Sequence, residues 1–492
     1  MKKSLFKDGS LSYEEVMSRV KAIDPIHDLL YKKQDDISMA RLFADVFKDV
    51  ARYNINAKSW YTYDGIRWKK DIGGMKIETN AKTIARVLAH YAADQEDHSY
   101  SQYVSKIQER RKRTSMIEDS RDFYYVESAS FDADPYLFNC QNCIIDLRTH
   151  EALEHDPKYL ISKVSNVTYD PSATSPDFEK FLNEIMCGDI EKAEYLQRIG
   201  GYALVGENTQ EECYMCYGAT TRNGKSTFLD TLEHLFGDYA ASIAPESLAQ
   251  KDRNSRNASS DIARLDGVRF LHCGEPQKKM KFDVALLKSL LGRDVITARN
   301  LYELEFQFTP IFTLFFNSNY LPVVTDDTLF SSGRIKVIPF DRHFEDREQD
   351  RQLKNRLKRK DNISGIFNWL LQGLSKYQDD GEIIAPPEVV VRATADYREK
   401  SDKIKSFMKD CLRPSGEAVT AKVLYDVFSS WCHENGYGVE NKGNFLDELR
   451  NKGLLSPSGT VNGRTEHNVL KGYSIDESYR YRSAVASLFD SS

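Results

Sequence analysis

The chain lacks the sequence features of membrane and secreted proteins. No apolar run approaches the length of a membrane-spanning helix, and the first residues, Met-Lys-Lys-Ser-Leu-Phe-Lys-Asp, have no apolar core like that of a signal peptide. A hydrophobic content of 41% still supports real cores, and 492 residues predict two to four domains. We therefore expect a cytoplasmic protein that has no membrane partner.

The chain also lacks an overall basic character. Its formal net charge is −6, so any contact with nucleic acid must come from local patches. One such patch is Arg110-Arg-Lys-Arg113, in a stretch that we expect to form long polar helices. A solvated helix face explains this patch better than DNA contact, although both interpretations stay open.

The eight cysteines form no compact metal motif. Two pairs have C-x-x-C spacing, Cys140/Cys143 and Cys213/Cys216, but they lie too far apart in sequence for a small zinc ribbon. The second pair falls on an apolar strand, where cysteine acts as a small hydrophobe. We expect free thiols in a reducing compartment and leave zinc binding as the less favoured alternative.

The clearest functional signal lies between a β-prone run at residues 212–217 and a helical pattern that begins at Phe228. A loop that presents backbone N–H groups at a helix N-terminus binds phosphate, and this strand–loop–helix order is that of a P-loop. Lys225 would reach the β- and γ-phosphates of ATP, and the Ser226 hydroxyl would ligate Mg²⁺. The predicted nucleotide-binding residues are Gly218, Ala219, Thr220, Thr221, Arg222, Asn223, Gly224, Lys225, Ser226 and Thr227.

The match to the P-loop pattern has one departure. Ala219 stands where the pattern requires the first glycine, and Gly218 comes one residue too early. Either Ala219 tolerates the turn, or Gly218 makes it from one residue further out. A chance Gly-Lys-Ser in a surface loop is the competing interpretation, but the flanking strand and helix argue against it.

Three further residues are candidates for ATP chemistry. Glu275 ends the apolar run 268–275, which we expect to be a buried strand, and a carboxylate at a strand end can orient water and help to hold Mg²⁺, although a plain strand-end charge is the alternative. Asn319 ends another buried strand, where its amide suits a γ-phosphate sensor. Arg334 follows and is a candidate arginine finger supplied by a neighbouring subunit, although a lone arginine is more often a surface ion-pair partner.

The order of these motifs resembles superfamily 3 helicases of the phage/plasmid and poxvirus-type primase-helicase family. In the core, the resemblance is carried by the P-loop, Gly274-Glu-Pro276, Lys288 to Arg299, Phe315-Phe-Asn-Ser-Asn319, Asp326 and Arg334. Upstream it is carried by Trp60 to Trp68, by Asn142-Cys-Ile-Ile-Asp146-Leu147 and by Tyr195 to Leu204, and downstream by a winged-helix-like tail.

The resemblance implies an α/β fold with an AAA+ P-loop ATPase core, an α/β amino-terminal domain and a carboxy-terminal winged-helix domain. The expected divisions are a charged segment (1–36), the amino-terminal domain (37–170), a helical collar for oligomerisation (171–205), the ATPase core (206–380), a linker (381–394) and the winged-helix domain with its tail (395–492).

The resemblance also implies a function. Such proteins form rings, usually hexamers, that use ATP and Mg²⁺ to move along single-stranded or forked DNA in the 3′ to 5′ sense. Lys288 and Arg299 then belong to the segment that leads into a DNA-contacting hairpin of the pore. Gly333 stands where many members carry a second arginine, which leaves Arg334 as the sole candidate finger.

Related chains often begin with a primase domain, but the sequence shows neither its zinc ribbon nor its acidic triad. We therefore expect no primer synthesis by this polypeptide, which would work beside a separate primase or polymerase. An ATP-regulated replication initiator without processive unwinding is the main alternative function. A small-molecule P-loop kinase is a weaker alternative, which the long hairpin at 297–308 argues against.

Overall fold

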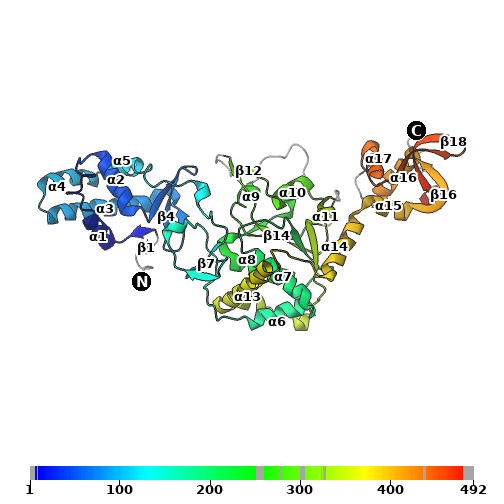
Figure 1. Cartoon of the computed structure of the whole chain (residues 1–492), viewed down its shortest axis with the longest axis horizontal. Helices are drawn as coiled ribbons and strands as arrows, with labels where there is room; N and C mark the ends of the chain where they lie inside the picture. Colours follow the sequence, from blue (N-terminus) through cyan, green and yellow to red (C-terminus); the bar gives the residue numbers. More distant parts are fainter. Residues whose placement is uncertain are drawn as a thin grey trace. The chain divides into compact units, whose positions relative to one another are not determined.

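The computed structural model describes residues 6–7, 9–250, 260–277, 280–299, 305–322, 324, 328–435 and 439–479. The chain divides into two compact units, residues 1–322 with 333–391, and residues 323–332 with 392–492. Both units combine helices with strands, so the predicted mixed α/β class is confirmed (Figure 1). Among the described residues, none of the helices has both the length and the apolar character that crossing a membrane requires.

The N-terminal part of the first unit is mainly helical and has its own apolar core. Helix α2 (Asp36–Phe47) buries Leu42, Phe43 and Val46, as the apolar spacing predicts, and the Asp35 side chain caps its N-terminus. Asp64-Gly65 between two aromatic runs predicts a β-hairpin, which β4 (Ser59–Tyr63) and β5 (Trp68–Lys70) confirm. The other elements here are β1 (Phe6–Lys7), β2 (Ser10–Leu11), α1 (Tyr13–Ile23), β3 (Ala51–Asn54), α3 (Met75–Asp94), α4 (His98–Ser105) and α5 (Arg110–Asp119).

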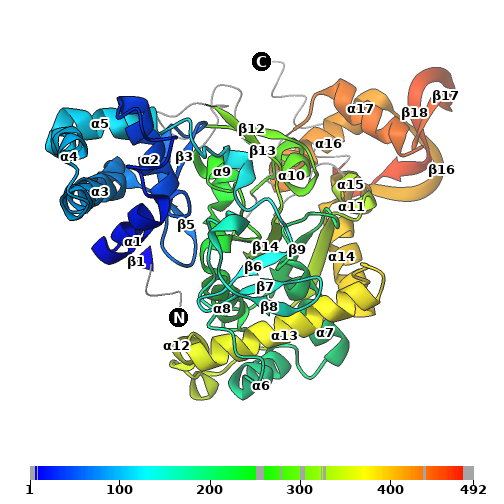
Figure 2. The same ribbon diagram turned by 60° about the vertical axis from the view of Figure 1, so that its left-hand side comes forward.

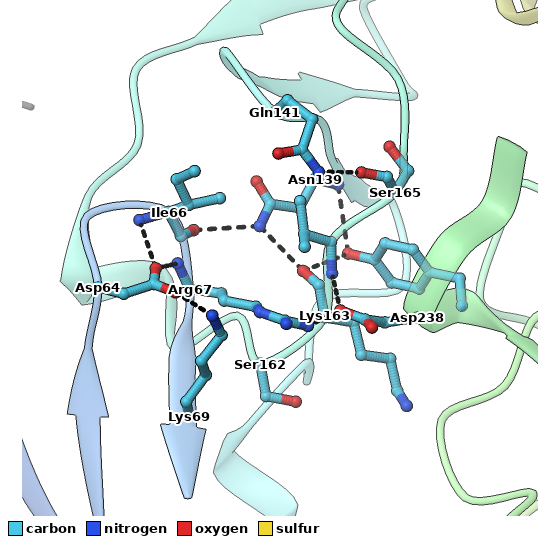
Figure 3. Close-up of polar contacts among 12 residues, drawn as sticks. Asp64, Ile66, Arg67, Lys69, Asn139, Gln141, Ser162, Lys163, Ser165 and Asp238 are labelled. Atoms are coloured by element: carbon cyan, nitrogen blue, oxygen red, sulfur yellow. Dashed lines mark hydrogen bonds and ion pairs between the residues drawn. The ribbon is translucent and has the colours of Figure 1, made fainter. Parts of the chain in front are cut away.

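A buried asparagine fixes the tip of this hairpin against the rest of the unit. Asn139 ends β6 (Leu137–Asn139), which forms a small sheet with β7 (Ile144–Asp146) and β8 (Glu151–Leu153). Its side-chain amide donates to the carbonyl oxygens of Ile66, at 3.1 Å, and of Lys163, at 2.9 Å (Figure 3). Beside it, Arg67 forms an ion pair with Asp238, which follows α8 (Lys225–Phe236). The aromatic hairpin is thus attached by polar contacts.

The composition of residues 159–167 predicts a short strand, which is not formed. Its backbone groups bond to three separate segments: the Leu160 carbonyl accepts from Asp132 N–H, the Ile161 carbonyl accepts from Trp68 N–H, and Ser165 N–H donates to Asn139. A strand needs one partner along its whole length to build a ladder. The β-prone composition was outweighed here by tertiary contacts.

A layer of helices packs closely because two glycines remove side chains at the contact. Helices α7 (Ile190–Tyr202) and α13 (Lys360–Asp379) lie side by side in both views (Figures 1 and 2). A Cβ on Gly201 would lie 2.2 Å from the Leu374 backbone, and one on Gly373 would lie 2.0 Å from the Gln197 carbonyl oxygen. This close approach requires glycine. Helices α6 (Pro176–Ile185) and α12 (Leu353–Leu357) pack beside them.

A five-stranded parallel sheet forms the centre of the first unit. Its strand order is β10-β11-β14-β9-β15, and every pairing is parallel. The strands are near-continuous apolar runs, as expected for a sheet covered on both faces. Their bounds are β9 (Cys213–Tyr217), β10 (Ala240–Ile243), β11 (Phe270–Cys273), β14 (Thr313–Ser318) and β15 (Ile335–Pro339). The other elements are α8 (Lys225–Phe236), α9 (Ser260–Ala263), α10 (Val284–Leu291), β12 (Ile296–Ala298) and β13 (Phe306–Phe308).

The second unit has a separate apolar core around Phe407, Phe428 and Phe445. The dipeptide Asn462-Gly463 predicts a hairpin turn, and the structure confirms it, with both residues at positive φ, as a type I′ turn requires. A third strand, β16, joins this hairpin and was not predicted. The elements are α11 (Thr328–Ser331), α15 (Lys403–Cys411), β16 (Leu412–Thr420), α16 (Ala421–Asn435), α17 (Lys442–Asn451), β17 (Leu455–Val461) and β18 (Arg464–Ile475). Helix α14 (Glu388–Ser401) spans the division between the two units.

Candidate phosphate-binding site

The predicted strand, loop and helix are present where the P-loop pattern requires them. Strand β9 ends at Tyr217, the loop follows, and α8 begins at Lys225. Residues of β14 and β15 flank β9, so the loop emerges at the carboxyl edge of the sheet between two neighbouring strands. Ligands of open parallel sheets bind at this edge. The loop N–H groups and the N-terminus of α8 both favour an anion there.

The structure explains the alanine at position 219. A Cβ on Gly218 would lie 2.1 Å from the Asn223 side-chain nitrogen and 2.7 Å from the Phe340 carbonyl oxygen. Gly224 has a φ of 83°, whereas Ala219 is exposed and is not among the residues with positive φ. Gly218 therefore meets the demand for glycine from one residue further out. This was one of the two possibilities that the sequence left open.

Lys225 is buried and is held by amide and carbonyl oxygens. Its Nζ lies 2.6 Å from Asn319 Oδ1, 3.0 Å from Asn223 Oδ1 and 3.4 Å from the Gly218 carbonyl oxygen. Burial lowers the pKa of the Lys225 ammonium to about 8, and the nearby charge of Glu275 opposes this shift. The structure thus brings together Lys225 and Asn319, which are 94 residues apart in the sequence.

Asn317 is a neighbour of the loop that was predicted to lie at the strand end but was given no role. Its side-chain nitrogen donates to the Ser226 hydroxyl at 2.9 Å. Side chains two residues apart on a strand point to the same face, so the choice of Asn319 could have indicated Asn317 as well. Ser226 itself is exposed.

Residues that follow β15 hold the loop from its outer side. Phe344 N–H donates to the Arg222 carbonyl at 2.9 Å, His343 Nδ1 lies 2.9 Å from the Thr221 carbonyl, and Arg222 forms an ion pair with Asp346. Arg222 adopts a φ of 60°, which this support stabilises in a non-glycine residue. No sequence signal marked these contacts, because they depend on how the chain returns after β15.

Glu275 lies at the same edge of the sheet, one strand away from Asn319. It follows β11, which pairs with β14 in register, and its side chain is exposed. Its charge acts on Lys225, so the two groups share one electrostatic environment. The role of Glu275 in water activation or metal binding stays a prediction.

Arg334 lies at the opposite edge of the sheet from the loop, where the parallel strands begin. It directly precedes β15, and its carbonyl accepts from the N–H of Cys213, the first residue of β9. Its guanidinium donates to Glu211 at 2.5 Å and to the Lys288 carbonyl at 2.9 Å. Because β9 and β15 are parallel, Arg334 and the phosphate loop are separated by the length of a strand. The structure does not bring Arg334 to the Lys225 site of its own chain.

The two predicted DNA-contacting residues lie on the segment expected for them. Lys288 is half-buried in α10, and Arg299 is exposed directly after β12. The hairpin expected at 297–308 is confirmed by the pairing of β12 with β13. DNA contact by these residues stays a prediction, and Asp326 lies outside the described residues.

The C-x-x-C pairs are buried in the apolar core. Cys213 and Cys216 both lie on β9, where a spacing of three places them on opposite faces of the sheet. Burial raises the pKa of the Cys140 thiol, which disfavours the thiolate that zinc requires. In the part of the chain that the structure describes, no cluster of metal-ligating side chains includes a cysteine.

Comparison with known proteins gives two matching families. Residues 40–187 match the family described as D5 N terminal like, and residues 216–334 match a family of unknown function. The chain is 26% identical over 350 residues to the putative helicase L207/L206 of Acanthamoeba polyphaga mimivirus, which covers 66% of this chain and 36% of that protein. It is 23% identical over 525 residues to the putative helicase 121R of Invertebrate iridescent virus 3, and this alignment covers 90% of this chain and 54% of that protein.

A third relative is the putative primase C962R of African swine fever virus, 20% identical with 75% of this chain and 43% of that protein covered. The chain thus spans about a third to a half of the length of these relatives. The predicted resemblance to phage and viral primase-helicases is confirmed by these matches. A solved structure of the NrS-1 C terminal region aligns with a TM-score of 0.49 at 12% identity, covering 89% of this chain and 99% of that one.

Proposed function

We propose that this chain, as a relative of viral helicases and primases, is an ATP-dependent DNA helicase of a phage or mobile element. It forms a ring and moves along single-stranded DNA during replication. The observation that carries the proposal is the contact of Lys225 with Asn319 beside a loop closed by Gly218 and Gly224. The proposal includes an AAA+ type core and a winged-helix role for the second unit.

The loop fits the phosphates of ATP. The Lys225 ammonium is held by three oxygens, which phosphate oxygens can replace. The Ser226 hydroxyl is exposed at the helix N-terminus, where Mg²⁺ is held in P-loop proteins, and Glu275 offers a second oxygen nearby. Bound Mg²⁺ would supply positive charge to the β- and γ-phosphates.

The proposed mechanism uses groups of this chain in distinct roles. Lys225 binds and neutralises the γ-phosphate, and Asn319, released from Lys225, donates its amide N–H to the attacking water or a phosphate oxygen. Asn317 fixes the Ser226 hydroxyl by its hydrogen bond of 2.9 Å. Glu275 accepts a proton from water at the edge of the sheet.

The position of Arg334 supports assembly from several copies. Because it lies at the amino edge of the sheet, it can complete an ATP site only in a neighbouring subunit, where it stabilises charge on the γ-phosphoryl group. To reach that neighbour, the guanidinium has to leave Glu211, which is itself 38% exposed and so pairs weakly. Hydrolysis at such a boundary moves the segment that carries Lys288 and Arg299, and with it the DNA strand.

The test is ATP hydrolysis and strand displacement on a forked duplex. We expect ATPase activity that single-stranded DNA stimulates, displacement that requires a 3′ single-stranded arm, and rings in electron micrographs with nucleotide and DNA. A protein that hydrolyses ATP and binds the fork without displacing a strand would instead be the ATP-regulated initiator. A protein whose ATPase ignores DNA and which stays monomeric would contradict the proposal.

A further inference from the structure

Three metal-ligating side chains meet behind the P-loop helix, away from the loop itself. Asp230 and Glu233 lie three residues apart on α8, which places them on one face of the helix, and His272 lies on β11. Their ligand atoms all lie within 4.8 Å of one another. This cluster has no part in the mechanism above.

His272 is the buried member of the cluster, and its imidazole ring is polar. It is 9% exposed, and neither ring nitrogen makes a hydrogen bond within the described part of the chain. The nearest acid oxygen is Glu233 Oε2, 3.8 Å from Nδ1, which is too long for a hydrogen bond and forms an ion pair only when the ring is protonated. Buried polar groups without partners are costly and rare in native proteins. The ring lies near two carboxylates, and the three groups together could bind one cation.

We propose that Asp230, Glu233 and His272 bind a divalent first-row transition cation, such as Zn²⁺ or Mn²⁺. An imidazole with two carboxylates suits this class, whereas Mg²⁺ and Ca²⁺ prefer oxygen ligands alone. Metal–ligand distances of about 2.0–2.2 Å require the three ligand atoms to close in by rotation of the Asp230 and Glu233 side chains. Both are partly exposed, at 23% and 34%, so they have room to rotate once Asp230 leaves its ion pair with Lys354.

Two lysines near the cluster act against a cation. Lys354 forms an ion pair with Asp230, and Lys358 acts on Glu233 through its charge. Lys354 is 47% exposed, so its ammonium can move to solvent when a cation replaces it. Lys354 is therefore a competitor for the site, and its removal should strengthen cation binding.

A cation here would tie together two elements that lead to the phosphate site. Helix α8 begins at Lys225, and β11 ends two residues before Glu275. The cluster differs from the Mg²⁺ position expected at Ser226, because it involves neither the loop nor nucleotide. Cation binding by this cluster does not depend on the proposed helicase function.

The experiment uses the full chain without nucleotide and Co²⁺ as a spectroscopic probe, with Zn²⁺ competition. We expect one Co²⁺ per chain, visible absorption typical of nitrogen and oxygen ligands, and no thiolate charge-transfer band. Asp230→Asn and Glu233→Gln should each weaken binding at least tenfold, and Lys354→Met should strengthen it. His272→Gln should abolish it, and the two carboxylate variants keep the test decisive if His272→Gln fails to fold.

Two matched variants separate this cluster from other cation sites. Ser226→Ala removes the P-loop hydroxyl and Cys187→Ser removes the exposed thiol, and neither should change Co²⁺ affinity. Zn²⁺ should also raise the thermal unfolding midpoint of the wild type but not of Glu233→Gln. No binding at 100-fold excess of Co²⁺, or binding that survives in Asp230→Asn and Glu233→Gln, would overturn the proposal.

Discussion

The two edges of the parallel sheet differ in what their polar side chains can reach. At the carboxyl edge, Lys225, Asn319 and Ser226 converge from two neighbouring strands, and Glu275 lies one strand away. At the amino edge, the Arg334 guanidinium donates to Glu211 and to the Lys288 carbonyl oxygen. One chain therefore gathers most of the candidate phosphate-binding groups at one edge and holds Arg334 in an ion pair at the other. If both edges serve ATP hydrolysis, the active unit contains at least two chains.

The carboxyl edge is tested most severely by Lys225→Ala. We expect ATP turnover to fall to background, because the loop loses its one buried cation, while the far-ultraviolet circular dichroism stays that of the wild type. Lys82→Ala, on the exposed face of α3, is the control and should keep full activity. Turnover unchanged in Lys225→Ala would show that this edge is not the ATP site.

The amino edge is tested by Arg334→Ala. We expect the homogeneous variant to lose about 10³-fold in turnover, because an arginine finger contributes on that order. Mixed with Glu275→Gln, which keeps its Arg334, the variant should recover part of the activity through intact sites at mixed boundaries. If no mixing ratio restores turnover, the two edges do not cooperate between chains.

The charge state of Lys225 gives a test that needs no mutation. Burial lowers its pKa to about 8, whereas bound phosphate requires the ammonium. Above pH 8 the nucleotide-free protein loses this proton, so binding has to take it up again, and affinity for ATP should fall about tenfold between pH 7 and pH 9. Titration calorimetry in buffers of different ionisation enthalpy would detect the proton. An affinity for ATP that does not change between pH 7 and pH 9 would mean that Lys225 stays charged over this range.

The same pKa predicts how stability depends on pH. In the folded protein Lys225 releases its proton near pH 8, whereas the unfolded chain keeps it to a higher pH. Because the unfolded state binds more protons in between, this group makes folding more favourable as pH rises above 8.

The smallest expected effect concerns the resting partner of Arg334. Glu211→Gln removes an ion pair whose side chains are 22% and 38% exposed, so the free energy of unfolding should change by less than about 1 kcal/mol. Under the proposed function it also frees the guanidinium, and turnover should hold or rise slightly. A large loss of turnover would assign Glu211 a direct role.

Local patterns predicted most of the elements that surround the site. Apolar runs bounded by polar residues indicated β9, β11 and β14, and the helical spacing after Gly224 indicated α8, because burial in a covered sheet selects such runs directly. The strand expected at 159–167 failed because its backbone groups bond to three different segments. The loop support from Phe344 and His343 could not be foreseen, since it depends on the path of the chain after β15.

The sequence alone determined that residues 212–236 form a strand, a phosphate-type loop and a helix, because glycine, lysine and apolar spacing act through local sterics and burial. It also placed Asn319 at a strand end. Only the tertiary structure decided that Asn319 contacts Lys225, that Gly218 takes the place of a glycine at 219, and that Arg334 lies at the far edge. The physical reason is the strand order: parallel pairing of β14 and β15 on either side of β9 fixes which distant residues become neighbours.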